Sequence, residues 1–281
     1  MPPLVPRADD YQERVRIALS CRDADALPRV EGAGGLFREG ESQYQLMHQG
    51  VKVWAHRYCG EWMTDLIRYL GGVHEPQEEV VFHRVLEHIP PGGVMLELGA
   101  YWGYYSLWFA RRVPGAVTHL IEASPEHLEV GVANFRLNGA TGTFTLAQVG
   151  ESPGLVTRQE EDGVSRNLPR LTVDDYLAWF RIPFLHILHC DVDGAEKGVL
   201  LGCRRTLEEA RAAYVFVSTH NDRELHGWCR EFLRERGYSL LAAHTMAQSY
   251  SYDGLLAARS PRVSRPGPVT LSLRGVNPAG G

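Results

Sequence analysis

Two acidic residues and two glycines are spaced as if to hold a nucleoside-like ligand. Glu97, Gly99 and Gly103 lie in the stretch VMLELGAYWGYYSLWFA, residues 94–110, and Glu122 ends the next apolar run. Glycines let the backbone approach a ligand that a Cβ atom would obstruct. The spacing is G-x-x-x-G, whereas dinucleotide binders use G-x-G-x-x-G to hold a pyrophosphate at a helix N-terminus. The turn therefore does not favour a phosphate.

The two acids indicate what the ligand carries instead. Glu97, just before the turn, suits a positively charged group, and Glu122 is placed to accept hydrogen bonds from a ribose diol. A ligand with a ribose, a cationic amino-acid part and no phosphate fits S-adenosylmethionine (SAM). An NAD-dependent oxidoreductase is the alternative enzyme class, but it lacks its phosphate turn here and leaves Glu97 without a role. A cofactor-binding scaffold without catalysis is the third reading.

A second group of polar residues could carry out the reaction. Transfer of a methyl group to an alcohol needs a base or a metal, and histidine is the natural base near neutral pH. We predict His220 as the general base, with Asp191 orienting either His220 or the substrate. A histidine that merely caps a strand is the plain alternative. A divalent metal such as Mg²⁺ is a less favoured alternative to a general base, so we assign no residue as a metal ligand. If a metal were bound, the candidate ligands would be Asp191, Asp193, His220 and Asp222.

These residues fall where predicted strands end. From Gln77 onward strand and helix patterns alternate, which indicates a parallel sheet covered by helices on both faces. Two closing strands with only a short loop between them predict an antiparallel hairpin. We therefore expect a Rossmann-like, doubly wound α/β fold with a mostly parallel seven-stranded sheet, and ligands beyond its carboxyl edge. The expected strands are 94–99, 117–123, 143–149, 185–194, 213–220, 238–245 and 253–260.

Three regions are expected along the chain. Residues 1–76 are predicted as a small, partly ordered N-terminal extension that serves as a lid or a dimer contact, with a short helix near 11–20 and a hairpin and helix in 41–76. Residues 77–260 would form the SAM-binding domain, in which 151–170 is a loop or polar hairpin. Residues 261–281 are expected to be a C-terminal tail. His74, Glu75 and Gln77 precede the first core helix, and we favour a helix start there over a lid.

Composition excludes several classes of function. The 281 residues carry a net charge of −5, so a broad nucleic-acid surface, which needs a basic surplus, is not expected. No apolar run reaches the roughly 18 residues of a membrane span, and we expect a cytoplasmic protein with no membrane partner. The five cysteines are scattered, which favours neither a disulfide framework nor a zinc site. A homo-oligomer is left open.

Over residues of about 74–258 the sequence resembles an FkbM-type class I SAM-dependent methyltransferase. The resemblance is carried by the glycine turn, LIEASPEHLEVGVANFRLNG, LTVDDYLAW and ILHCDVDGAEKGVLLG, and includes the Asn-x-x-x-Asn helix end formed by Asn134 and Asn138. GGVHEPQEEVVF, VFVSTH and SYSYDGLLAAR also resemble a subset of the family. Three positions depart from its usual pattern: His189 replaces a lysine, Asp193 a glutamate, and Ser218 an acid.

The resemblance implies an O-methyltransferase that acts on a small hydroxylated molecule, a sugar or a secondary metabolite. N-methylation of an amino sugar is a close variant. The resemblance also implies the cofactor site: the methionine part lies against the glycine turn, Glu122 binds the ribose hydroxyls, and Asp191 lies at the opening of the site. The expected cofactor-binding residues are Glu97, Gly99, Ala100, Tyr101, Gly103, Ser106, Glu122, Ala123, Ser124, Gln148, Val149 and Asp191.

Overall fold

A seven-stranded sheet forms the centre of the computed structural model, which describes residues 8–159, 163, 165–220 and 223–275. The strands lie in the order β12-β13-β11-β10-β4-β5-β6. Only β13 runs antiparallel to its neighbours, so the doubly wound sheet with an antiparallel C-terminal hairpin is confirmed. The strand bounds are β4 Val94–Leu98, β5 Val117–Glu122, β6 Thr143–Leu146, β10 Leu185–Cys190, β11 Ala212–Thr219, β12 Ser239–His244 and β13 Gly254–Arg259.

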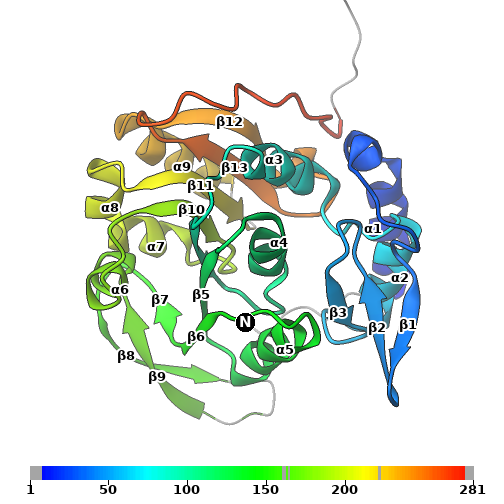
Figure 1. The fold of residues 1–281 in the computed structure, drawn as a ribbon. Coiled ribbons are helices and arrows are strands. Elements are labelled where there is room, and N and C mark those ends of the chain that lie inside the picture. The colour runs from blue at the N-terminus through cyan, green and yellow to red at the C-terminus, as the bar shows by residue number, and fades with distance from the viewer. Residues whose placement is uncertain (1–7, 160–162, 164, 221–222, 276–281) are drawn as a thin grey trace, which may run out of the picture.

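Helices cover both faces of this sheet (Figure 1). Strand β11 is buried along its whole length, and its side chains alternate between two cores, with Phe216 in one and Val215 and Val217 in the other. Such two-sided burial is what a parallel sheet requires. One face packs against α3 Pro76–Leu86, α4 Tyr104–Arg112 and α5 Pro125–Leu137, and the other against α6 Val173–Trp179, α7 Glu196–Gly202, α8 Arg204–Glu208 and α9 Arg223–Glu235.

Several helices and strands begin or end differently from what the sequence patterns indicate. Ser124 caps α5, its hydroxyl accepting the N–H of His127 at 3.3 Å with Pro125 at the first helical position. Helices α7 and α8 are separate, because the chain leaves helical geometry at Cys203. The strand expected over 143–149 is also divided: β7 Gln148–Val149 joins a separate small sheet with β8 Gly154–Gln159 and β9 Ser165–Leu171. The polar-hairpin alternative for 151–170 is therefore correct.

The described part of the N-terminal extension stands beside α5 (Figure 1). It has α1 Ala8–Ser20, a short 3₁₀ helix η1 Asp23–Ala26, a three-stranded sheet of β1 Leu36–Glu39, β2 Ser42–Leu46 and β3 Lys52–Trp54, and α2 Glu61–Tyr69. The hairpin and helix expected in 41–76 are thus present in enlarged form.

The Asn-x-x-x-Asn pair of α5 attaches this extension to the domain. Asn134 accepts the backbone N–H of Trp54 at 2.8 Å, and Asn138 both accepts the N–H of Lys52 at 2.9 Å and donates to its carbonyl at 2.6 Å. The two side chains thus act toward β3 as a neighbouring strand would. Asn134 also donates to the carbonyl of Trp102 in the glycine turn at 2.9 Å, which ties extension and turn together.

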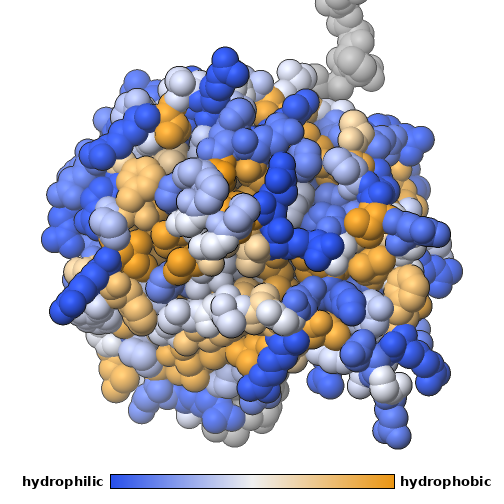
Figure 2. Space-filling view, in the orientation of Figure 1, coloured by the Kyte–Doolittle hydropathy of each residue, from blue (hydrophilic) through white to orange (hydrophobic). Residues whose placement is uncertain are grey.

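Residues 261–275 form no helix or strand but are held against the domain. The side chain of Gln77 donates to the carbonyl of Ser272 at 2.6 Å, and Tyr214 donates to the carbonyl of Arg265 at 2.6 Å. Figure 2 shows hydrophilic side chains around the rim of one face with hydrophobic patches between them. Within the described residues no helix has the length and apolar character to cross a membrane.

Replacing Asn138 by alanine should loosen β3 from α5. The substitution leaves backbone groups of Lys52 without partners, so we expect a loss of about 1–3 kcal/mol of unfolding free energy and faster amide hydrogen exchange at residues 52–54. Asn167→Ala is the matched control, because Asn167 bonds only in an exposed pair with Thr157. Unchanged exchange at residues 52–54 in Asn138→Ala would show that the pair does not hold the extension.

Candidate active site

The glycine turn brings β4 into close contact with the end of β10. Gly99 has a φ of +73°, and a Cβ atom there would lie 1.6 Å from the carbonyl oxygen of Asp191. Gly103, with a φ of +66°, is the left-handed residue from which α4 begins. Both predicted glycines are therefore required by the backbone. β4 and β10 are also the strands between which the chain order reverses, where open α/β sheets bind their ligands.

Glu97 lies beneath this turn and steadies it. Its side chain is buried, and one carboxylate oxygen accepts the backbone N–H of Ser106 at 3.0 Å. Burial raises the pKa of Glu97 above its usual value. The Ser106 hydroxyl is buried with no hydrogen-bond partner in the described structure. Two of the predicted cofactor residues thus contact each other at the start of α4.

Glu122, at the end of β5, gathers three further predicted residues. Its carboxylate accepts the backbone N–H groups of Ala123 and Ser124 at 2.8 Å each and that of Tyr101 at 3.0 Å. A carboxylate offers about four acceptor positions, so one is left for a hydroxyl group such as that of a ribose. The residues present are therefore compatible with a nucleoside here.

A cavity of about 1090 Å³ opens beside Glu122. Tyr101 and Ser124 line it from the domain, and residues 54–57 line it from the extension. The ring of Tyr101 stacks on His127 with centroids 3.6 Å apart. Trp102, in contrast, is buried and stacks on Tyr58 of the extension at 4.1 Å, so it belongs to the core.

Gln148 and Val149 end the next strand beyond Glu122. They form β7, which pairs in parallel with β9, and the N–H of the preceding Ala147 bonds to the carbonyl of Glu122 at 3.0 Å. Val149 is buried in the second core, whereas Gln148 is half-buried. Of these two predicted residues, Gln148 is the one whose side chain reaches a surface.

Asp191 and His220 come together as the strand order requires. Asp191 follows β10, His220 follows the adjacent β11, and Asp191 Oδ1 lies 3.2 Å from His220 Nε2. Two more carboxylates surround the same ring: Glu196 Oε1 lies 2.6 Å from Nδ1, and Asp253 Oδ1 lies 3.4 Å from Nε2. We call these four residues the mouth cluster. Glu196 is missing from the sequence prediction, and Asp253 was not assigned a role in it.

The mouth cluster keeps His220 charged. Burial disfavours its imidazolium form, but the hydrogen bonds and charges of Asp191, Glu196 and Asp253 outweigh this and raise the pKa of His220 to about 12. The predicted role as general base stays untested, yet a ring with both nitrogens directed at carboxylates is poorly suited to accept a proton.

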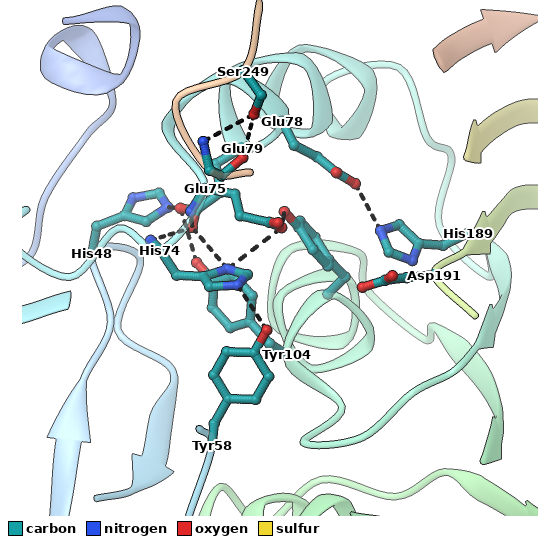
Figure 3. Close-up of polar contacts among 12 residues, drawn as sticks. His48, Tyr58, His74, Glu75, Glu78, Glu79, Tyr104, His189, Asp191 and Ser249 are labelled. Carbon is teal, nitrogen blue, oxygen red and sulfur yellow. Dashed lines mark hydrogen bonds and ion pairs between the residues drawn. The ribbon is translucent and has the colours of Figure 1, made fainter. Parts of the chain in front are cut away.

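A second acid–histidine pair lies beside the mouth (Figure 3). Glu78 of α3 accepts from His189 Nε2 at 2.8 Å, and although burial disfavours the charged ring, this carboxylate raises the pKa of His189. His189 is the residue that departs from the usual lysine of the resemblance, and the ion pair with Glu78 favours its cationic form. Glu75 accepts from the hydroxyl of Tyr105 at 2.9 Å, and burial followed by the nearby acids raises the pKa of Glu75.

The helix start favoured for His74, Glu75 and Gln77 is present, with Glu75 as the N-cap residue, and the lid alternative stays a prediction. Helix α3 begins at Pro76, and the Glu75 side chain makes no capping bond there. Gln77 is buried and accepts the backbone N–H of Tyr250 at 2.8 Å, so it fixes the loop that leads to Asp253. His74 packs in an aromatic cluster with Trp102 and Tyr104.

The structure brings together only part of the alternative metal site. Within the described residues no three His, Cys, Asp or Glu side chains are arranged to hold a metal ion. Asp193 is exposed in the loop after β10, with a φ of +47°. Asp222 lies outside the described residues.

Comparison with known proteins identifies the family. The sequence profile of the methyltransferase FkbM domain matches residues 88–240, more than half of the chain. The chain belongs to the FkbM methyltransferase family. The enzyme is accordingly a SAM-dependent methyltransferase, as the sequence predicts, and the oxidoreductase alternative is not retained. No curated protein sequence matches this methyltransferase.

Several solved structures are similar to this chain at low sequence identity. Precorrin-6y C5,15-methyltransferase from Geobacter metallireducens is 15% identical with a TM-score of 0.44, covering 65% of this chain and 88% of its own. Magnesium protoporphyrin IX methyltransferase from Synechocystis, solved with bound SAM, is 15% identical with a TM-score of 0.42 and coverages of 65% and 77%. A putative SAM-dependent methyltransferase from Streptococcus mutans is 12% identical with a TM-score of 0.47 and coverages of 79% and 56%.

Replacing Gly99 by alanine should disrupt the turn. The added methyl group would collide with the carbonyl of Asp191, so we expect a loss of about 3 kcal/mol or more in unfolding free energy and no measurable binding of S-adenosylhomocysteine (SAH). Gly139→Ala is the matched control, because Gly139 has a φ of +60° but no atom within 4 Å of its Cβ position. It should cost about 1 kcal/mol and leave SAH binding intact. Equal losses in both variants would contradict the close contact.

Proposed function

We propose that this methyltransferase moves a methyl group from SAM to a hydroxyl of a small molecule, such as a sugar or secondary metabolite. The observation that carries the proposal is the placement of the mouth cluster directly against the glycine turn, through the contact between Gly99 and Asp191. A methyl donor seated on the turn would present its reactive carbon to groups that can orient an acceptor and move its proton.

The proposed cofactor site consists of the turn, Glu122 and the end of the third strand. Glu97 and Ser106 steady the turn, Tyr101, Ala123 and Ser124 are held by Glu122, and the open acceptor position of Glu122 takes a ribose hydroxyl. Gln148 lies beside the adenine in this proposal. When bound, SAM supplies an electrophilic methyl group on a sulfonium.

Charge at the mouth supports a small acceptor over a nucleic acid. Acidic side chains outnumber histidines there: Glu75, Glu78, Asp191, Glu196 and Asp253 lie near His189 and His220. Phosphate backbones are bound by lysine and arginine, and a mouth of acids would repel them. The same surplus of acids favours an ammonium-bearing acceptor as the second candidate, with N-methylation of an amino sugar as the reaction.

The acceptor class is tested with SAM carrying a labelled methyl group. We expect label in the small-molecule fraction when the purified enzyme is offered a pool of sugars, polyols and phenols. Label that enters only an amino-sugar pool would replace the O-methyltransferase proposal by the N-methyltransferase one. Label that enters only tRNA would overturn both.

The role of Glu122 is tested by pairing a variant with a matched ligand. Glu122→Gln should weaken SAH binding about tenfold or more by calorimetry, because an ionised acceptor of the ribose is lost. An SAH analogue without ribose hydroxyls should bind the wild type more weakly but lose little further affinity in Glu122→Gln. Exposed Glu87→Gln is the control. If the two effects simply add, Glu122 does not contact the ribose.

A further inference from the structure

We propose that Asp253 is the general base of the reaction, that it accepts the proton of the acceptor, and that His220 is a positioning residue held between carboxylates. The inference rests on the proposed methyl transfer and deepens it by assigning the proton. It follows from how the three carboxylates of the mouth cluster share the two nitrogens of the His220 ring.

His220 has no nitrogen to spare for the acceptor. Its Nδ1 is directed at Glu196 Oε1 at 2.6 Å, and its Nε2 faces Asp191 at 3.2 Å and Asp253 at 3.4 Å. Glu196 is fully buried and its Oε1 also accepts the N–H of Gly194 at 3.0 Å, so this carboxylate is fixed. A ring that donates from both nitrogens is an imidazolium and is not a proton acceptor.

The two remaining carboxylates differ in position. Asp191 lies on the cofactor side of His220, because its backbone carbonyl contacts Gly99 in the turn. Asp253 meets the same Nε2 from another element, the loop that leads into β13, at the longer of the two distances. One N–H cannot fully satisfy both acids, so Asp253 is the one left with open acceptor positions.

The backbone holds Asp253 at this position. Gly254 pairs with Thr219 across β11 and β13, and a Cβ atom at Gly254 would lie 2.3 Å from the Thr219 hydroxyl. This close approach brings the residue before Gly254 next to the residue after Thr219, which is His220. The Asp253 side chain remains 33% exposed there, enough to meet an acceptor, and His220 is the only polar partner recorded for it within the described residues.

Charged and polar groups on several elements surround Asp253. They are Asp191 after β10, His220 after β11, Glu75 and Glu78 at the start of α3, Arg14 of α1, and Tyr58 and Cys59 of the loop after β3. Burial, followed by the charges of Asp191 and Glu78, raises the pKa of Asp253 to about 7, against the opposing effects of His220 and Arg14. For Asp191, burial is outweighed by the hydrogen bond and charge of His220, and its pKa is lowered. A base is most effective near the working pH, which favours Asp253 over Asp191.

The step is balanced with these groups alone. The acceptor oxygen attacks the methyl carbon, an O–C bond forms, and the C–S bond breaks with its electron pair left on sulfur. The hydroxyl proton passes to the Asp253 carboxylate and from there to water through the exposed mouth. His220 stays protonated throughout, and its charge stabilises the Asp253 carboxylate between turnovers.

The first test is the pH dependence of methyl transfer in Asp253→Asn. With the acceptor pool above, wild-type kcat should rise with pH around a midpoint of about 7 and then level, because the base must be ionised. Asp253→Asn should lower kcat by about 10²- to 10⁴-fold and remove the rising limb, with SAH affinity unchanged. Asp25→Asn, on the exposed η1, is the control and should behave as wild type. Full activity with an unchanged limb in Asp253→Asn would overturn the assignment.

His220→Gln separates positioning from catalysis. Loss of the imidazolium removes a cation beside Asp253, so the pKa of Asp253 should rise. The rise of kcat with pH should therefore move to higher pH. If His220 were the base, the limb would disappear in His220→Gln and persist in Asp253→Asn. Failure of SAH to bind the wild type would count against the proposed function. If SAH binds but the rise of kcat with pH is unchanged in Asp253→Asn, the result would count against the role of Asp253 alone.

A measurement without an acceptor decides the same question. In ¹³C NMR of protein labelled at aspartate carboxyl carbons, with SAH present, one resonance should titrate between about pH 6 and 8, far above an ordinary aspartate. That titration should vanish in Asp253→Asn and remain in Asp25→Asn. The absence of any such titration in the wild type, or its survival in Asp253→Asn, would overturn the proposal.

Discussion

The close contact between Gly99 and the carbonyl of Asp191 is the constraint on which the site depends. It joins β4 to β10 at the point where the strand order reverses, and it leaves no room for a side chain. The glycine turn and the mouth cluster are therefore neighbours because of the backbone geometry alone. The carboxylate of Glu122 then orders the backbone N–H groups of Tyr101, Ala123 and Ser124 around that turn.

A buried polar network makes the extension part of the same structure. Glu79 of α3 lies 3.1 Å from His48 Nε2, accepts the backbone N–H of His74 at 2.7 Å and accepts from Tyr104 at 3.0 Å (Figure 3). Burial opposes its charge, but the histidines and these bonds lower the pKa of Glu79. Removing one partner would leave a buried charge uncompensated, so extension, α3 and α4 are energetically coupled. The extension shapes the domain's cavity from a fixed position.

Local sequence signals predicted the elements better than the contacts. Apolar runs marked the strands, and parallel pairing of β10 with β11 required Asp191 to lie near His220. The approach of Asp253 to His220 was not predictable, because it depends on the register of β11 against β13, in which Thr219 pairs with Gly254, 35 positions later in the chain. The burial of Trp102 was not predictable either, because it depends on Tyr58 of the extension packing on its ring.

The division of roles between the acids of the mouth follows from crowding. Like charges at short range cannot all ionise equally, and the environment separates their pKa values. Asp191 lies nearer the His220 imidazolium, and its pKa is lowered. Burial and repulsion from neighbouring acids raise the pKa values of Asp253 and Glu75. His220, which the sequence presents as the obvious base, is the group that creates this difference. Burial and the charges of Asp191 and Glu78 raise the pKa of Asp253 to about 7, and the fixed cation of His220 opposes a further rise.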